Sequence, residues 1–130
     1  MPHLPISSFF IAIFSVALIG LSVPVSLRRV KIGDMIEDSP DQPLHRRIRA
    51  QGNFIEYVPL CLIGLVLTEA EIASLWSALS IGIALVCGRV LHVIGMYGNY
   101  APLRGLGMVL TYLSLVLTAL FLSGTMLGFV

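Results

Sequence analysis

The chain has 130 residues and too few charges to form the polar surface of a soluble domain of that length. Hydrophobic residues make up 57% of it and charged residues 12%, whereas soluble domains carry about 25% charged residues. The apolar surface is therefore expected to face lipid. The net charge of +1 does not favour nucleic acid as a partner.

Four apolar runs follow one another along the chain, and each is long enough to cross a bilayer as a helix. A helix rises about 1.5 Å per residue, so roughly 20 residues span a hydrocarbon core of about 30 Å. The first run holds no charged residue, and Pro24 near its end is expected to kink it. We expect helices at about residues 6–27, 45–68, 72–96 and 103–130.

The connections between these runs predict how the helices are arranged. The loop at residues 28–43 is polar and carries charges of both signs. The links at residues 69–71 and 97–102 are short, and short links join antiparallel neighbours. The predicted fold class is therefore all-α: one transmembrane domain over residues 1–130, built as an up-down bundle of four helices.

The positive charges predict an orientation in the membrane. Six of the eight Lys and Arg residues lie between Arg28 and Arg49. Since cytoplasmic loops carry the excess of Lys and Arg, we expect the 28–43 loop in the cytoplasm and both termini on the opposite face. The compact chain favours a multi-pass protein of a bacterial inner membrane.

Polar side chains inside the apolar runs are the main functional signal. An ionisable residue at membrane depth costs about 2.5–3.5 kcal/mol and usually faces protein or a wet cavity. Arg49, Asn53 and Glu56 are spaced i, i+4, i+7, which places them on one helical face. Arg89 and His92 form a second stripe on the third helix, and Arg104 begins the fourth.

A purely structural explanation of these residues stays open. Glu56 could neutralise Arg49 or Arg89, and Asn53 could bridge helices. The count of charges argues against it, because several arginines, Arg46 and Arg104 included, share one carboxylate. The surplus positive charge needs anions from lipid headgroups or from a bound anionic ligand.

Other candidates also have structural explanations. His92 alone would more often be a helix–helix hydrogen bond, Tyr97 is typical of an interfacial aromatic, and Arg28 and Arg29 could anchor the first helix at the headgroups. The two cysteines lie in apolar runs without the spacing of metal ligands, so we expect free thiols and no metal site.

Three segments resemble the MAPEG superfamily, the membrane-associated proteins of eicosanoid and glutathione metabolism. Residues 47–59, RIRAQGNFIEYVP, are similar to its second-helix signature. Residues 88–92, GRVLH, and 101–104, APLR, resemble the corresponding third- and fourth-helix segments of its prostaglandin E synthase branch. The positions that match in the first segment are Arg49, Ala50, Asn53, Glu56 and Pro59.

The resemblance implies a homotrimer that binds glutathione, as co-substrate, between neighbouring subunits. Arginines would hold the two carboxylates, Glu56 the ammonium and Asn53 the peptide part. Arg104 matches the catalytic position that stabilises the thiolate. The glutathione-binding set so implied is Arg28, Arg29, Arg49, Asn53, Glu56, Tyr57, Arg89, His92 and Tyr97.

Two differences bear on the activity. Met96 stands where many members have Tyr, with Tyr97 next to it, and Gly105 stands where the prostaglandin synthase branch has Ser. These differences argue against prostaglandin isomerisation. They leave thiolate activation by Arg104 untouched.

The function expected is an integral membrane glutathione transferase, with peroxidase activity as a variant, that serves detoxification. The thiolate would attack a lipophilic electrophile that enters from the bilayer. The alternative is a non-catalytic membrane protein that binds glutathione or an anionic lipid in a structural or regulatory role. A small transporter is less favoured, because the sequence shows no pair of broken helices.

Overall fold

The computed structural model describes residues 3–33, 40–72 and 74–129, and it confirms an all-α membrane bundle. Each helix in the described residues is long and apolar enough to span a membrane. The helices are α1 (Pro5–Ile32), α2 (Gln42–Glu71), α3 (Leu75–Tyr97) and α4 (Ala101–Met126).

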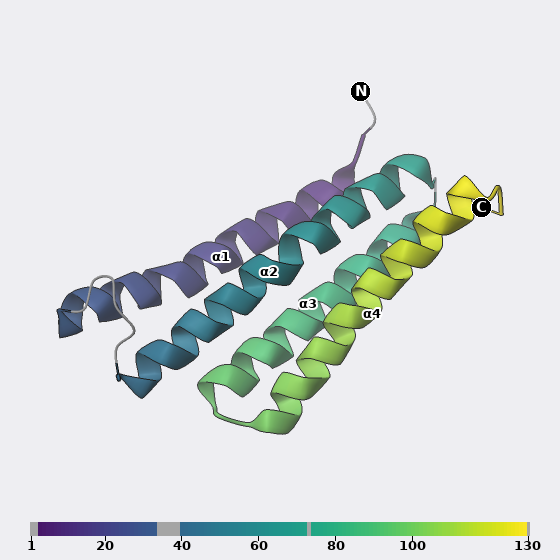
Figure 1. Ribbon diagram of the computed structural model, residues 1–130. Coiled ribbons are helices and arrows are strands. Elements are labelled where there is room, and N and C mark those ends of the chain that lie inside the picture. Colours follow the sequence, from purple (N-terminus) through teal and green to yellow (C-terminus); the bar gives the residue numbers. More distant parts are fainter. Residues whose placement is uncertain (1–2, 34–39, 73, 130) are drawn as a thin grey trace.

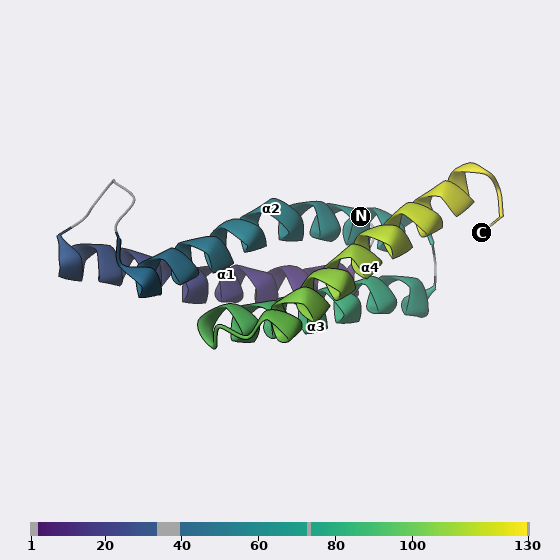
Figure 2. The same ribbon diagram turned by 60° about the horizontal axis from the view of Figure 1, so that its bottom comes forward.

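The chain runs up and down through the bundle. The α1–α2 and α3–α4 connections lie at one end, and both chain ends lie at the other (Figure 1). α1 packs mainly on α2, α2 packs on α3, and α3 and α4 form the closest pair. Figure 2 shows α4 crossing α3 and ending away from it. The core between α1, α2 and α3 is built from aromatic and branched side chains, among them Phe10, Phe14, Phe54, Leu65, Ile81 and Leu85.

The first connection is shorter than the expected loop at 28–43. α1 continues through Pro24 to Ile32 and ends at Gly33, whose φ of 73° is in the left-handed region that favours glycine. α2 begins already at Gln42, because the Asp41 side chain accepts a hydrogen bond from the Leu44 N–H at 3.0 Å. Residues 34–39 of the expected loop lie outside the described residues.

The other bounds also differ from the expected ones. α3 begins at Leu75 rather than at 72, because Ile72 is the extended residue that ends α2. α4 begins at Ala101, two residues early, with Pro102 in its first turn, where a missing N–H removes no helical hydrogen bond. It ends at Met126 rather than at 130.

Polar bonds tie α1 to α2 at the connection end. Arg28 forms a two-pronged ion pair with Asp41, with N–O distances of 2.7 and 3.0 Å. Arg47 donates to the Pro24 carbonyl at 3.1 Å. Two basic residues at this end, Arg28 and Arg47, therefore help to hold α1 and α2 together.

Glu69 ties the same two helices at the other end. Its carboxylate accepts hydrogen bonds from the backbone N–H groups of Ile6 at 3.0 Å and Ser7 at 2.7 Å, and from the Ser7 hydroxyl. The first N–H groups of a helix have no partner within the helix, and a negative charge there faces the positive end of the helix dipole. Glu69 thus caps α1 from α2.

Glycines let the backbones of α3 and α4 touch near their connection. A Cβ on Gly95 would lie 2.4 Å from the backbone nitrogen of Arg104, and one on Gly107 would lie 2.5 Å from that of His92. Small residues permit such close approach between membrane helices. This contact sets the start of α4, and with it Arg104, beside the end of α3.

Candidate functional site

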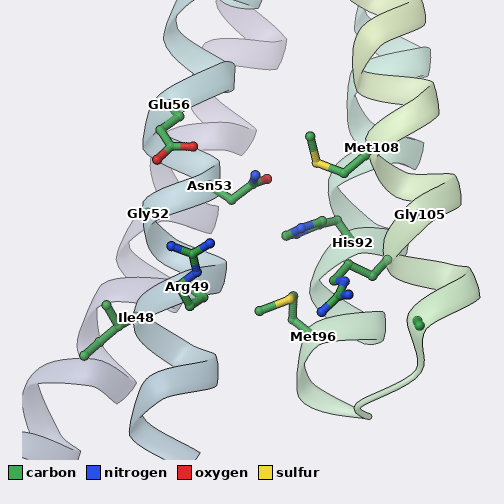
Figure 3. A pocket seen from close by; sticks show the side chains of 11 residues that line it. Ile48, Arg49, Gly52, Asn53, Glu56, His92, Met96, Gly105 and Met108 are labelled. Carbon is green, nitrogen blue, oxygen red and sulfur yellow. The ribbon is translucent and has the colours of Figure 1, made fainter. Parts of the chain in front are cut away.

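A cavity of about 510 Å³ opens between α2, the end of α3 and the start of α4. Figure 3 shows the α2 side chains on one wall and the α3 and α4 side chains on the other, with Asn53 pointing across. The residues that line it are Ile48, Arg49, Gly52, Asn53, Glu56, His92, Met96, Ala101, Arg104, Gly105 and Met108.

The cavity brings together five of the residues singled out from the sequence: Arg49, Asn53, Glu56, His92 and Arg104. The first three share a wall because α2 is a regular helix and their spacing repeats its turn. His92 and Arg104 meet them through the glycine contact between α3 and α4. Three helices therefore supply one polar site at one end of an apolar bundle.

The charged side chains that line this cavity form no ion pair among the described residues. Arg49, Glu56 and Arg104 are exposed, and among the described residues the ion pair that forms is the one between Arg28 and Asp41. The described residues therefore contain no ion pair between Glu56 and either Arg49 or Arg89. Lipid headgroups, a bound ligand or a second subunit are the partners open to such charges.

The position of Arg104 at a helix start favours an anion nearby. The residue lies in the first turn of α4, where the unpaired N–H groups and the helix dipole attract negative charge. His92 is almost fully buried at the cavity wall, and its Nδ1 has no hydrogen-bond partner among the described residues.

Arg89 lies behind the cavity wall rather than in it. Its Nη1 donates to Asn53 Oδ1 at 2.6 Å, and its Nη2 donates to the Thr111 hydroxyl. The guanidinium carbon also lies 5.9 Å from the centre of the Tyr57 ring. Arg89 therefore forms a hydrogen bond with Asn53, which lines the cavity, although Arg89 itself does not line it.

Four other residues of the implied glutathione-binding set lie outside this cavity. Tyr57 pairs with Tyr112 at a ring distance of 5.8 Å. Tyr97 is exposed at the end of α3, while Met96 lines the cavity. Arg29 lies in the last turn of α1.

Arg28 is the fourth of them, and its partner is Asp41. The hydrogen bond from the Arg28 guanidinium holds the pKa of the Asp41 carboxyl below its ordinary value. Within one chain this arginine therefore serves the α1–α2 connection.

Sequence reasoning missed some of the lining. Gly52 and Met108 each lie one helical turn from a predicted site residue, Arg49 and Arg104 respectively. Helical spacing could have found them, but neither carries a charged or titratable group. Gly52 leaves space in the α2 wall, since nothing lies within 4 Å of where its Cβ would be.

The described residues form four apolar helices long enough to span a membrane, three of which line a polar cavity, and this arrangement defines an integral, multi-pass membrane protein. The family model described as "MAPEG family" matches residues 6–123, and the chain belongs to that family. It is also similar to the inner membrane protein YecN of Escherichia coli strain K12 and of strain O6:H1, at 27% identity over 115 residues and 88% of each chain. The name of these relatives states a location and no activity. No solved structure gives a significant match.

Proposed function

We propose that this protein is a membrane glutathione transferase that binds glutathione in the cavity between α2, α3 and α4. The observation that carries the proposal is the set of charges on the lining: Arg49 and Arg104 with one carboxylate, Glu56, all exposed and without ion-pair partners among the described residues. Glutathione has two carboxylates, one ammonium and one thiol; Arg49 suits one carboxylate, Glu56 suits the ammonium, and Arg104 suits the sulfur as thiolate.

Each polar group of the cavity has a role in this proposal. Arg49 binds a carboxylate, for which the planar guanidinium is suited. Glu56 is the one acid of the lining and takes the ammonium. Asn53 hydrogen-bonds the peptide part, and Arg104 faces the sulfur.

The reaction starts from the thiolate, because the thiolate and not the thiol is the nucleophile. The positive charge of Arg104 and the start of α4 favour loss of the thiol proton to water. The sulfur then forms a bond to the electrophilic carbon, and the leaving group departs with its electron pair. In the peroxidase variant the same thiolate would attack the peroxide oxygen of a lipid hydroperoxide, the O–O bond would break, and the lipid alcohol would leave. A second glutathione would then convert the sulfenic acid to glutathione disulfide and water.

The alternative function is binding of glutathione or an anionic lipid without catalysis. Ultraviolet absorbance of the purified protein with glutathione separates the two, because only the transferase holds the bound ligand as thiolate. Turnover of a generic lipophilic electrophile in detergent completes the test. A protein that binds glutathione as the thiol and shows no turnover would support the non-catalytic role.

We expect the protein to assemble as a homotrimer. In a single bundle Arg49, Glu56 and Arg104 are exposed, which is costly at membrane depth, and neighbouring subunits would shield them. Native mass spectrometry of the detergent-solubilised protein should show three copies. A monomer that still binds glutathione would exclude a site shared between subunits.

We also expect the 28–43 connection to be cytoplasmic in a bacterial inner membrane, since six of eight Lys and Arg residues lie between Arg28 and Arg49. The termini would then face the other side. Cysteines introduced at Ser39, outside the described residues, and at the C-terminus should react with impermeant reagents from opposite sides, in a background with Cys61 and Cys87 replaced by Ser. Labelling of both from one side would contradict this orientation.

A further inference from the structure

Arg89 is a buried charge that bridges three helices. Only 4% of it is exposed, and no carboxylate pairs with it among the described residues. Its bonds go from α3 to Asn53 on α2 and to Thr111 on α4. Burying an arginine without a neighbouring anion costs free energy of folding. We therefore looked for a role of Arg89 in the function of the protein.

The bond to Asn53 decides which way the asparagine amide faces. A guanidinium carries donors and no acceptor, so the atom of Asn53 that meets Arg89 is its oxygen, at 2.6 Å. The NH₂ group of the same amide is then left to donate to other partners. Asn53 lines the cavity, so the group it can offer to a ligand there is a hydrogen-bond donor.

Thr111 holds Arg89 from the other side. Its hydroxyl donates to the Gly107 carbonyl at 2.9 Å, which leaves its lone pairs to accept from Arg89. Gly88 makes room for this hydroxyl, since a Cβ there would lie 2.8 Å from Thr111 Oγ1. Thr111 is fully buried and does not line the cavity.

We propose that Arg89 and Thr111 are positioning residues, which hold the Asn53 amide so that its NH₂ group faces the cavity. The site thereby selects a ligand that places a carbonyl or carboxylate oxygen at this point. The inference rests on the proposed function where it concerns glutathione. The orientation of the amide itself can be tested without any ligand.

The chain offers a direct probe of this amide, because it has two asparagines, Asn53 and Asn99. Asn99 lies in the turn between α3 and α4 and serves as the internal control. In protein labelled with ¹⁵N at asparagine, Thr111→Val should shift or broaden the side-chain NH₂ signals of Asn53 and leave those of Asn99 in place. Thr111→Ser, which keeps the hydroxyl, should restore the parent spectrum.

Glutathione affinity gives a second readout that a general loss of stability would not reproduce. Thr111→Val should weaken glutathione binding about two- to tenfold, the range for one neutral hydrogen bond. In an Asn53→Ala background the same change should have no further effect, because Thr111 acts through Asn53. If valine lowers the melting temperature, Thr111→Ala removes the same hydroxyl without added bulk.

The outcomes separate the two proposals. Unchanged Asn53 signals in both hydroxyl-free variants would overturn the positioning role, whatever the protein binds. Equal losses of affinity in the parent and Asn53→Ala backgrounds would also overturn it. A parent protein that binds no glutathione but shows the Asn53-specific shift would end the proposed function and support the positioning role.

Discussion

Glu56→Gln is expected to weaken glutathione binding roughly ten- to hundredfold, the effect of losing one charge-assisted hydrogen bond. Glu56 is the one carboxylate of the cavity lining, so no neighbour there can replace it as partner of the ammonium. The amide of glutamine keeps the size of the side chain and one acceptor oxygen. The change therefore removes the charge and little else.

Isothermal titration calorimetry on the detergent-solubilised protein measures this loss. Glu71→Gln is the matched control, because Glu71 lies at the end of α2 and is not part of this cavity. It should bind glutathione as the parent does. Unchanged affinity in Glu56→Gln, with an unchanged melting temperature, would mean that Glu56 serves only packing between helices or subunits.

Arg104→Ala should lower the rate at neutral pH while leaving glutathione bound. A free thiol has a pKa near 8.5, so only about 3% of it is thiolate at pH 7. Removing Arg104 raises the pKa of the bound thiol towards that value, and the loss through this route cannot exceed about thirtyfold at pH 7. Activity should return as pH rises, because the thiol then ionises without the help of the arginine.

A pH–rate profile measures the shift, which is towards higher pH because the positive charge had lowered the pKa of the thiol. Arg46→Ala is the control, since Arg46 is basic and close in sequence to the site but does not line the cavity. If Arg104 only anchors α4 to headgroups, Arg104→Lys would be silent. A profile of Arg104→Ala that overlays that of the parent would reject thiol activation and direct attention to His92 and Tyr97.

The sequence alone determined the membrane class, the four spans and one wall of the site. Span length follows from bilayer thickness and needs no tertiary information. Arg49, Asn53 and Glu56 share a face because a helix repeats every 3.6 residues, and all three line the cavity. His92 and Arg104 were identified from motifs in the family's order, and they complete the opposite wall.

Only the tertiary structure decided which arginines face the cavity and which serve the protein itself. Arg28 is held by Asp41, and Arg89 by Asn53 and Thr111. Composition cannot reveal such pairings, because they depend on how each helix is rotated and how closely its neighbours approach. At Gly95 the separation of α3 and α4 is set by a missing side chain against a backbone, and a glycine in a single sequence does not show which neighbouring helix it faces.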